Sequence, residues 1–221
     1  MDTPDQQNQP STPVVRPPRQ PLVEGADGRL RCSWCGDDPE YQRYHDEEWG
    51  RELRGDRELF EKISLEGFQS GLSWITILKR RPAFRSAFAG FEPEVVAAMG
   101  DDDVVRLMGD AGIIRNRMKI EATIRNAQAM LRLDRPLGEL VWSFAPPREG
   151  RPRPRTWDDI ATTTPESHAL SSELRAHGFR FVGPTTMHAL MQSAGLVDDH
   201  LDGCWRARET DATSAGAGSG S

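Results

Sequence analysis

The sequence predicts an all-α domain between two disordered tails, on three observations. Apolar residues recur at helical spacing through most of the chain, with prolines near the expected helix starts and glycines near the expected ends. Alternating runs typical of strands do not extend beyond a few residues, and no internal repeat is present. The two ends differ in composition and lack periodicity.

The periodic part of the chain defines one domain. Residues 1–29 are rich in Pro, Gln and Asp, and residues 209–221 are small and polar, so both segments are predicted to be disordered. Residues 30–208 remain as a single domain, long enough to bury a hydrophobic core. In order, helices are expected over residues 57–70, 73–80, 82–88, 93–99, 102–110, 116–131, 157–161, 165–177 and 185–194. The segment 146–156, "PPREGRPRPRT", is a loop by composition.

Composition excludes several classes of protein. A formal net charge of -6 argues against binding polyanions over the whole surface, although basic residues cluster in "LKRRPAFR", "IIRNRMK" and "REGRPRPR". No signal-like apolar segment follows Met1 and no run is long enough to span a bilayer, so we expect a cytoplasmic protein without membrane contact. Three cysteines are too few for a disulfide scaffold, which leaves metal binding or simple burial.

Metal-ligand residue types stand at both ends of the domain. Cys32 and His45 lie near its start, and His200 and Cys204 lie near its end. Together they could bind one structural zinc ion per chain in a tetrahedral site, fastening the first segment to the last. The alternative is that the cysteines are small buried residues and the histidines ordinary polar groups. Cys35 could also replace His45 as a ligand, and spacing alone does not choose between them.

Aromatic residues concentrate around the first part of the expected metal set. Tyr41 and Tyr44, the chain's two tyrosines, are three residues apart and share a helix face, with Trp34 and Trp49 nearby. Such rings could hold a planar nucleobase between their faces. A cluster of core aromatic residues is the alternative.

Glu66 interrupts an apolar helical stripe. Leu59 and Ile63 mark the stripe, and Glu66 continues it where an apolar residue is expected. A buried carboxylate is costly without a specific partner. Either Glu66 bends out to solvent at the helix edge, or it has a function inside the domain.

A glycine turn between two predicted helices, with basic residues after it, could bind a DNA backbone. Gly112 and Ile113 form the turn, and Arg115, Arg117 and Lys119 follow. Turn amides leading into a helix N-terminus can hold a phosphate, and neighbouring cations add charge. The alternative is an ordinary turn with a solvated basic face.

A second loop offers a wedge for a DNA duplex. Gly71 breaks the helix in "SGLSW" and places Leu72 and Trp74 at a bend. A leucine at a loop tip can fill the gap left by a nucleotide that has rotated out of the stack. The alternative is a core leucine.

These segments carry a family resemblance. The motifs that carry it are "RCSW", "YHDEEWG", "LFEKISLEGFQSGLSWITIL", "DAGIIRNRMKI", "VWSF", "GFRFVGPTT", "MQSAGLVDDH" and the "GC" at 203–204. In this order, over about residues 31–204, they resemble the DNA-3-methyladenine glycosylase I family of bacterial alkylation-repair enzymes.

The resemblance implies a fold and a set of sites. It implies a helix-hairpin-helix DNA glycosylase fold with Gly112 in the hairpin, and a structural zinc site that joins the N- and C-terminal segments. The zinc ligands it implies are Cys32, His45, His200 and Cys204. The base-pocket residues it implies are Tyr41, Tyr44, Glu66 and Trp74, to which the aromatic cluster adds Trp34 and Trp49. It also implies that Leu72 intercalates into DNA.

The resemblance also implies a function. The expected enzyme acts in base-excision repair: it rotates 3-methyladenine out of alkylated double-stranded DNA and hydrolyses the N-glycosidic bond, with Glu66, Tyr44 and Trp74 as the expected catalytic residues. An ionised Glu66 would favour the cationic methylated base over neutral adenine. Since no lysine is placed to form a Schiff base with the sugar, we expect a monofunctional, monomeric enzyme without strand cleavage. The alternative is a non-catalytic, zinc-stapled helical module that binds damaged DNA.

Overall fold

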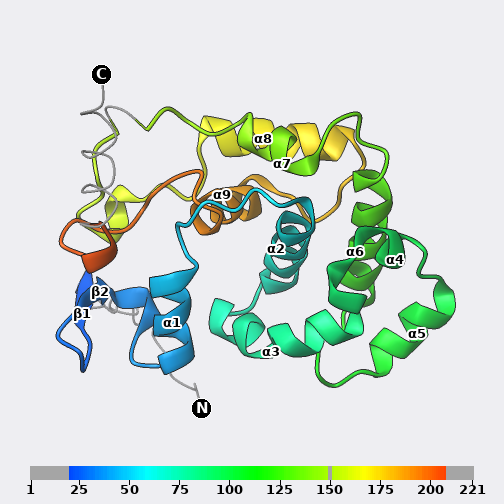
Figure 1. The fold of residues 1–221 in the computed structure, drawn as a ribbon, viewed down its shortest axis with the longest axis horizontal. Helices are drawn as coiled ribbons and strands as arrows, with labels where there is room; N and C mark the ends of the chain where they lie inside the picture. The colour runs from blue at the N-terminus through cyan, green and yellow to red at the C-terminus, as the bar shows by residue number, and fades with distance from the viewer. Residues whose placement is uncertain (1–19, 149–150, 208–221) are drawn as a thin grey trace, which may run out of the picture.

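The computed structural model describes residues 20–148 and 151–207, and within them the chain is predominantly helical (Figure 1). The helices are α1 (Pro39–Glu47), α2 (Asp56–Gln69), α3 (Trp74–Ala87), α4 (Pro93–Ala97), α5 (Asp101–Gly109), α6 (Arg117–Met130), α7 (Leu137–Trp142), α8 (Pro165–Ala176) and α9 (Pro184–Ser193). Short 3₁₀ turns span Ser33–Cys35, Ala89–Phe91 and Trp157–Asp159. None of the helices in these two ranges is long and apolar enough to cross a membrane.

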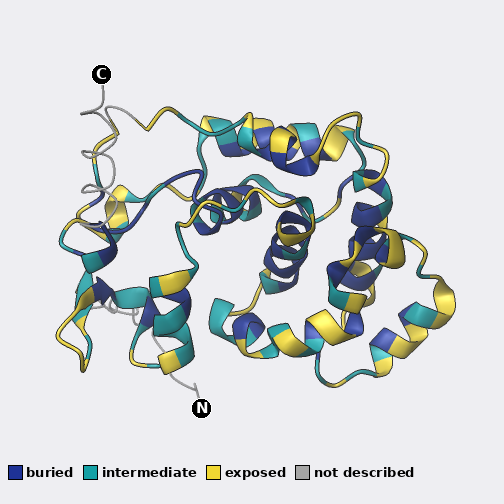
Figure 2. Ribbon diagram, in the orientation of Figure 1, coloured by how far each residue is buried: buried dark blue, intermediate teal, exposed yellow. Residues whose placement is uncertain are grey.

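Helix α2 is the centre of the fold. It contacts α3, α6, α7 and α9. Helix α1 lies to one side of these helices, next to the two short strands described below (Figure 1). From Leu59 to Phe68 every residue except Glu61 is buried, so the second half of α2 is enclosed on nearly all sides (Figure 2). A helix buried all round is expected to be apolar, which makes its charged residues the exceptions to explain.

Two short strands correct the prediction of an entirely helical domain. β1 (Leu22–Glu24) pairs antiparallel with β2 (Leu30–Cys32), with Leu22 opposite Cys32. The described structure therefore begins within the segment predicted as the N-terminal tail, and the boundary at residue 29 was too late. Strands of three residues are too short for an alternating pattern to reveal them. The rest of the predicted tails, residues 1–19 and 209–221, lies outside the described residues.

The helix predictions need three further corrections. The helices expected at 73–80 and 82–88 are one helix, α3, with the exposed Pro82 inside it. Proline removes one backbone N–H, but here it faces solvent and the helix continues. Helices α1 and α7 were not predicted, and the segment expected at 157–161 is only a 3₁₀ turn. The start of α1 is well defined, because the Asp38 side chain accepts hydrogen bonds from the N–H groups of Glu40 and Tyr41.

Candidate active site

A cavity of about 360 Å³ lies among α1, α2, the start of α3 and α9. This volume is in the range of pockets that bind small molecules. The cavity brings together all six residues expected to bind a base: Trp34, Tyr41, Tyr44, Trp49, Glu66 and Trp74. Further lining that the sequence did not indicate comes from the C-terminal part of the domain, including Trp157, Ile160, His188, Gln192 and Ser193.

Aromatic rings in mutual contact form one wall of the cavity. The ring of Trp34 lies edge-on to Tyr41 and to Trp49, with centroids 5.0 and 5.2 Å apart. The rings of Tyr44 and Trp74 are 5.5 Å apart and tilted by 46°. Edge-to-face and tilted contacts of this kind fix ring orientation. The result is a rigid, largely apolar wall suited to a flat aromatic ligand.

Glu66 lies at this wall and is 3% exposed. The alternative that it bends out to solvent is therefore wrong. Burial raises the pKa of its carboxyl to about 7, against the opposing effects of nearby Lys62 and of the Ser193 hydroxyl, which donates a 3.4 Å hydrogen bond to Oε1. The protein thus compensates the charge of this carboxylate only weakly, and a cationic or amino-bearing ligand would compensate it better.

Lys62 is a buried charged residue that sequence reasoning missed. It stands one helical turn before Glu66 on α2 and is 8% exposed. Its Nζ donates a 3.4 Å hydrogen bond to the Tyr44 hydroxyl and lies 4.9 Å from the centroid of the Tyr44 ring. The spacing of four residues from Glu66 was the available signal, because residues at i and i+4 share a helix face.

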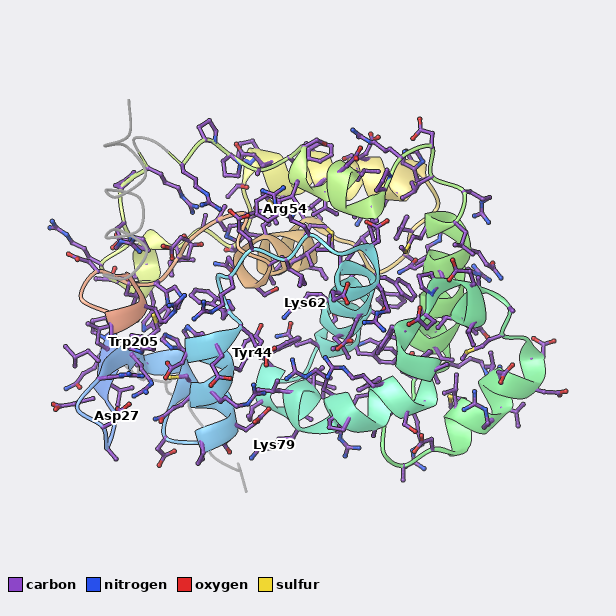
Figure 3. All side chains as sticks on the ribbon, in the orientation of Figure 1. Asp27, Tyr44, Arg54, Lys62, Lys79 and Trp205 are labelled. Atoms are coloured by element: carbon purple, nitrogen blue, oxygen red, sulfur yellow. The ribbon has the colours of Figure 1, made fainter. Side chains whose placement is uncertain are left out.

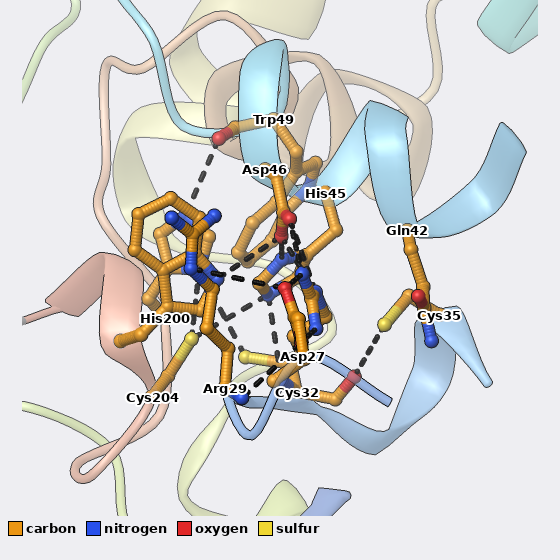
Figure 4. A network of polar contacts seen from close by, with 12 residues as sticks. Asp27, Arg29, Cys32, Cys35, Gln42, His45, Asp46, Trp49, His200 and Cys204 are labelled. Atoms are coloured by element: carbon orange, nitrogen blue, oxygen red, sulfur yellow. Dashed lines mark hydrogen bonds and ion pairs between the residues drawn. The ribbon is translucent and has the colours of Figure 1, made fainter. Parts of the chain in front are cut away.

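Four buried ligand-type side chains meet where the first and last segments of the domain come together (Figure 4). The ligand atoms of Cys32, His45, His200 and Cys204 all lie within 4.8 Å of one another. Cys204 Sγ is 3.5 Å from His45 Nε2 and 3.7 Å from His200 Nδ1. Tetrahedral zinc with S and N ligands would place such atoms about 3.5 Å apart, so this set could hold a metal ion.

The second nitrogen of each histidine has an acceptor. His45 Nδ1 is 2.8 Å from Asp46 Oδ1, and His200 Nε2 is 3.2 Å from the carbonyl oxygen of Trp49. These contacts orient the rings so that His45 Nε2 and His200 Nδ1 face the thiols, which is the usual arrangement for metal-binding histidines. The Cys35 Sγ instead donates to the Cys32 carbonyl oxygen at 3.1 Å and lies outside the cluster. The four clustered side chains therefore include His45 and not Cys35.

The loop that follows α2 presents an apolar side chain to solvent. Leu72 is 41% exposed, so the alternative of a core leucine is wrong. Gly71 before it has a φ of +84°, a conformation that L side chains rarely adopt. The tight bend therefore depends on glycine, and it holds Leu72 at the loop tip.

The turn between α5 and α6 differs from its expected form in three ways. Ile113 is 2% exposed, so its side chain belongs to the core. The Gly112 N–H already donates a 2.7 Å hydrogen bond to Asp110 Oδ1. Lys119 was expected among the surface cations, but it is 8% exposed and its Nζ donates to the carbonyl oxygens of Phe68 at 2.9 Å and Ser70 at 2.8 Å. Lys119 therefore ties the start of α6 to the end of α2.

Two of the expected cations remain at the surface of this turn. Arg115 and Arg117 are exposed, beside the N-terminus of α6. Lys119 fixes the start of α6 to the carbonyl oxygen of Ser70, two residues before Leu72. Exposed cations and an exposed apolar loop tip are features expected of a DNA-binding protein.

Comparison with known proteins assigns the chain. The model of the methyladenine glycosylase family matches residues 34–207. The chain belongs to the methyladenine glycosylase family. It is 48% identical over 177 residues to DNA-3-methyladenine glycosylase 1 of Escherichia coli strain K12, covering 79% of this chain and 95% of that protein. Identity to the DNA-3-methyladenine glycosylase of Haemophilus influenzae is 44% over 180 residues, covering 79% of this chain and 96% of that protein.

Solved structures of this family share the fold. A crystal structure of a 3-methyladenine DNA glycosylase I is 46% identical, with a TM-score of 0.75, covering 79% of this chain and 98% of that chain. The Staphylococcus aureus enzyme, described by its recognition of 3-methyladenine, is 36% identical with a TM-score of 0.73, covering 78% of this chain and 95% of that chain. A family member with a tyrosine-to-phenylalanine substitution has been solved in complex with 3-methyladenine.

The raised pKa of Glu66 predicts how stability depends on pH. Between about pH 4.5 and pH 7 the native state holds a proton on this carboxyl that the unfolded chain has lost, so the free energy of unfolding falls as pH rises through this window. For Glu66→Gln we expect a free energy of unfolding about 1 to 3 kcal/mol above the unsubstituted protein at pH 8 and little difference at pH 4.5. Urea denaturation at both pH values measures this. If the variant and the unsubstituted protein differ in free energy of unfolding by the same amount at both pH values, the prediction is contradicted.

Proposed function

We propose that this chain removes 3-methyladenine from alkylated double-stranded DNA by hydrolysing the N-glycosidic bond, as the first step of base-excision repair. The observation that carries the proposal is a buried, weakly compensated carboxylate, Glu66, in an aromatic cavity of suitable size. Relatives at 44% and 48% identity bear the name of this activity, and a family member has been solved in complex with 3-methyladenine. The enzyme is further proposed to act as a monomer.

The chemistry suits a weak general acid–base site. Methylation at N3 makes adenine in a nucleotide cationic and thus a good leaving group, so the enzyme has mainly to select and orient it. Glu66 accepts hydrogen bonds from the amino edge of the base and stabilises its positive charge. Trp74, Tyr41, Trp34 and Trp49 supply ring faces for the rotated base, and Tyr44 completes the wall beside Trp74. Neutral adenine offsets less of the cost of burying the carboxylate and is bound less well.

The three lysines of the sequence support a monofunctional reaction. The Lys62 ammonium donates a hydrogen bond to the Tyr44 hydroxyl, and the Lys119 ammonium donates to two backbone carbonyl groups. Lys79 is at the surface and paired with Asp38. With all three engaged in this way, attack on C1′ comes from water, and no Schiff base leads to strand cleavage.

DNA binding is proposed for the surface formed by the two loops. In this proposal α5, the turn at Gly112 and α6 form the helix-hairpin-helix element, with Arg115 and Arg117 near the phosphates. The backbone N–H groups of the turn, including that of Ile113, face the phosphate, because the Ile113 side chain is buried. Leu72 at the Gly71 bend fills the space left by the rotated nucleotide. Lys119 holds the hairpin and the wedge at a fixed separation.

Release of free base from methylated DNA tests the proposed function directly. The unsubstituted protein should release 3-methyladenine from alkylated duplex DNA, measured by chromatography of the freed bases. Glu66→Gln keeps the shape but removes the charge, so affinity for 3-methyladenine should fall by about 1.5 to 3 kcal/mol, or roughly tenfold to a hundredfold. Binding to methylated DNA without release would instead support the non-catalytic damage-binding module.

Truncation of the wedge should separate DNA from base recognition. Leu72→Ala removes an exposed side chain, so it should leave the melting temperature and the affinity for the free base nearly unchanged. Excision from duplex DNA should slow several-fold, because the gap in the stack is no longer filled. Equal excision rates for the variant and the unsubstituted protein would remove Leu72 from the DNA interface.

Zinc is proposed as the metal of the Cys/His cluster. Two thiols and two imidazoles are ligands that zinc prefers, and four protein ligands leave no open position, as in structural sites. The hydrogen bonds from His45 to Asp46 and from His200 to the Trp49 carbonyl support the assignment. When bound, the ion would neutralise the thiolates and join β2, α1 and the C-terminal segment.

Metal analysis of the purified protein should find one tightly bound zinc per chain. Cys204→Ser should lose the metal and lower the free energy of unfolding by several kcal/mol, because metal binding is coupled to folding of this region. Cys35→Ser is the matched control, since its thiol lies outside the cluster, and its zinc content should equal that of the unsubstituted protein. Fresh, unchelated protein without zinc would contradict the assignment.

A further inference from the structure

Lys62 is a buried charged group that the proposed reaction leaves unused. It belongs to α2, and its ammonium faces α1, where Tyr44 is located (Figure 3). Its Nζ lies 4.9 Å from the centroid of the Tyr44 ring and 5.5 Å from that of Trp74. The two aromatic faces thus separate the ammonium from the cavity, since Lys62 itself does not line it.

Carboxylates near Lys62 partly offset the lowering of its pKa by burial. Burial lowers the pKa of Lys62, whereas the carboxylates of Glu66 and Glu48 raise it, and Arg81 opposes them. Arg81 is itself paired with Glu48, with Nη2 2.8 Å from Oε1, so its own charge is largely balanced. The faces of the Tyr44 and Trp74 rings add cation–π attraction for an ammonium group.

The number of donors and acceptors on each group determines whether the Tyr44 hydroxyl donates or accepts at this contact. A lysine ammonium has three donors and no acceptor, so at their 3.4 Å contact the Tyr44 oxygen must accept. Burial raises the pKa of Tyr44 well above its usual value, so the hydroxyl keeps its own proton. Within residues 20–148 and 151–207, no acceptor lies at hydrogen-bond distance from that hydroxyl. The proton is therefore free for an acceptor on a ligand in the cavity.

We infer that Lys62 is a positioning residue that makes Tyr44 a hydrogen-bond donor toward the base, beside the acceptor Glu66. This inference rests on the proposed function and specifies its recognition step. The two side chains together present one donor and one acceptor to the ligand edge. The matching ligand is a purine whose edge carries an amino group next to an unprotonated ring nitrogen. A purine with a carbonyl in place of the amino group would put an oxygen against Glu66 and bind poorly.

A double-mutant cycle on affinity for free 3-methyladenine tests this coupling. Lys62→Met keeps the chain length but removes donor and charge, and Tyr44→Phe removes the hydroxyl. Each should weaken binding about 3- to 10-fold, the range for one hydrogen bond. The double variant should match Tyr44→Phe within about twofold, because Lys62 acts only through that hydroxyl. If the losses of affinity in the two single variants multiply in the double variant, the inference is overturned. It is also overturned if Lys62→Met binds 3-methyladenine as tightly as the unsubstituted protein.

Two further variants separate donation from simple charge or packing. In a Glu66→Gln background, Lys62→Met should still weaken binding 3- to 10-fold, and loss of this effect would show that Lys62 acts through the charge of Glu66. Lys62→Arg, which keeps a cationic donor, should bind better than Lys62→Met. Lys79→Met removes a surface lysine and should leave affinity unchanged. Thermal melts identify any destabilised variant. If Lys62→Met does not fold, Lys62→Leu takes its place in the same comparisons.

The outcomes also distinguish this inference from the proposed function. Unsubstituted protein that neither binds nor releases 3-methyladenine would contradict the function itself. Normal binding and release by the unsubstituted protein, together with an unaltered Lys62→Met variant, would overturn only the role of Lys62.

Discussion

The cost of removing charge from water governs the architecture around α2. This helix lies at the centre of the fold, yet it buries Lys62 and Glu66 one turn apart. Neither residue has a close ion-pair partner within the described residues, and the carboxylate has only a 3.4 Å contact with a hydroxyl. A protein core of this size would be more stable with apolar residues at both positions. The retained charges are thus best explained by a ligand that compensates them.

The Cys/His cluster connects the aromatic wall to the far end of the chain. His45, in the cluster, directly follows Tyr44, in the cavity wall, on α1. The rings of His200 and Trp49 are nearly perpendicular with centroids 4.6 Å apart, and His200 Nε2 is 3.2 Å from the Trp49 carbonyl oxygen. Two cavity residues are therefore held by side chains of the cluster. Structural support and base recognition are separate in chemistry but share one short helix.

Much of this arrangement could be predicted from the sequence, because its residues are unusual for their local context. A carboxylate on an apolar stripe and four ligand-type residues at the domain ends stand out without a structure. Lys62 and Lys119 did not, because a lysine on a helix resembles an ordinary surface residue until the packing of neighbouring helices is known. The β-hairpin and α7 are too short to produce a clear period. The orientation of the Gly112 amide depends on Asp110, a local hydrogen bond that composition does not reveal.

The joining of the first and last segments also bears on the order in which the molecule assembles. The contact between Cys32 and His200 closes a loop of 168 residues, nearly the whole domain. Contacts so distant in sequence form late, because the entropy of closing the loop is lost before the contact contributes. During synthesis, α2 and the helices around it can associate before residue 200 emerges from the ribosome. The wall that carries Tyr44 is therefore expected to be completed late in folding, together with the base-binding cavity.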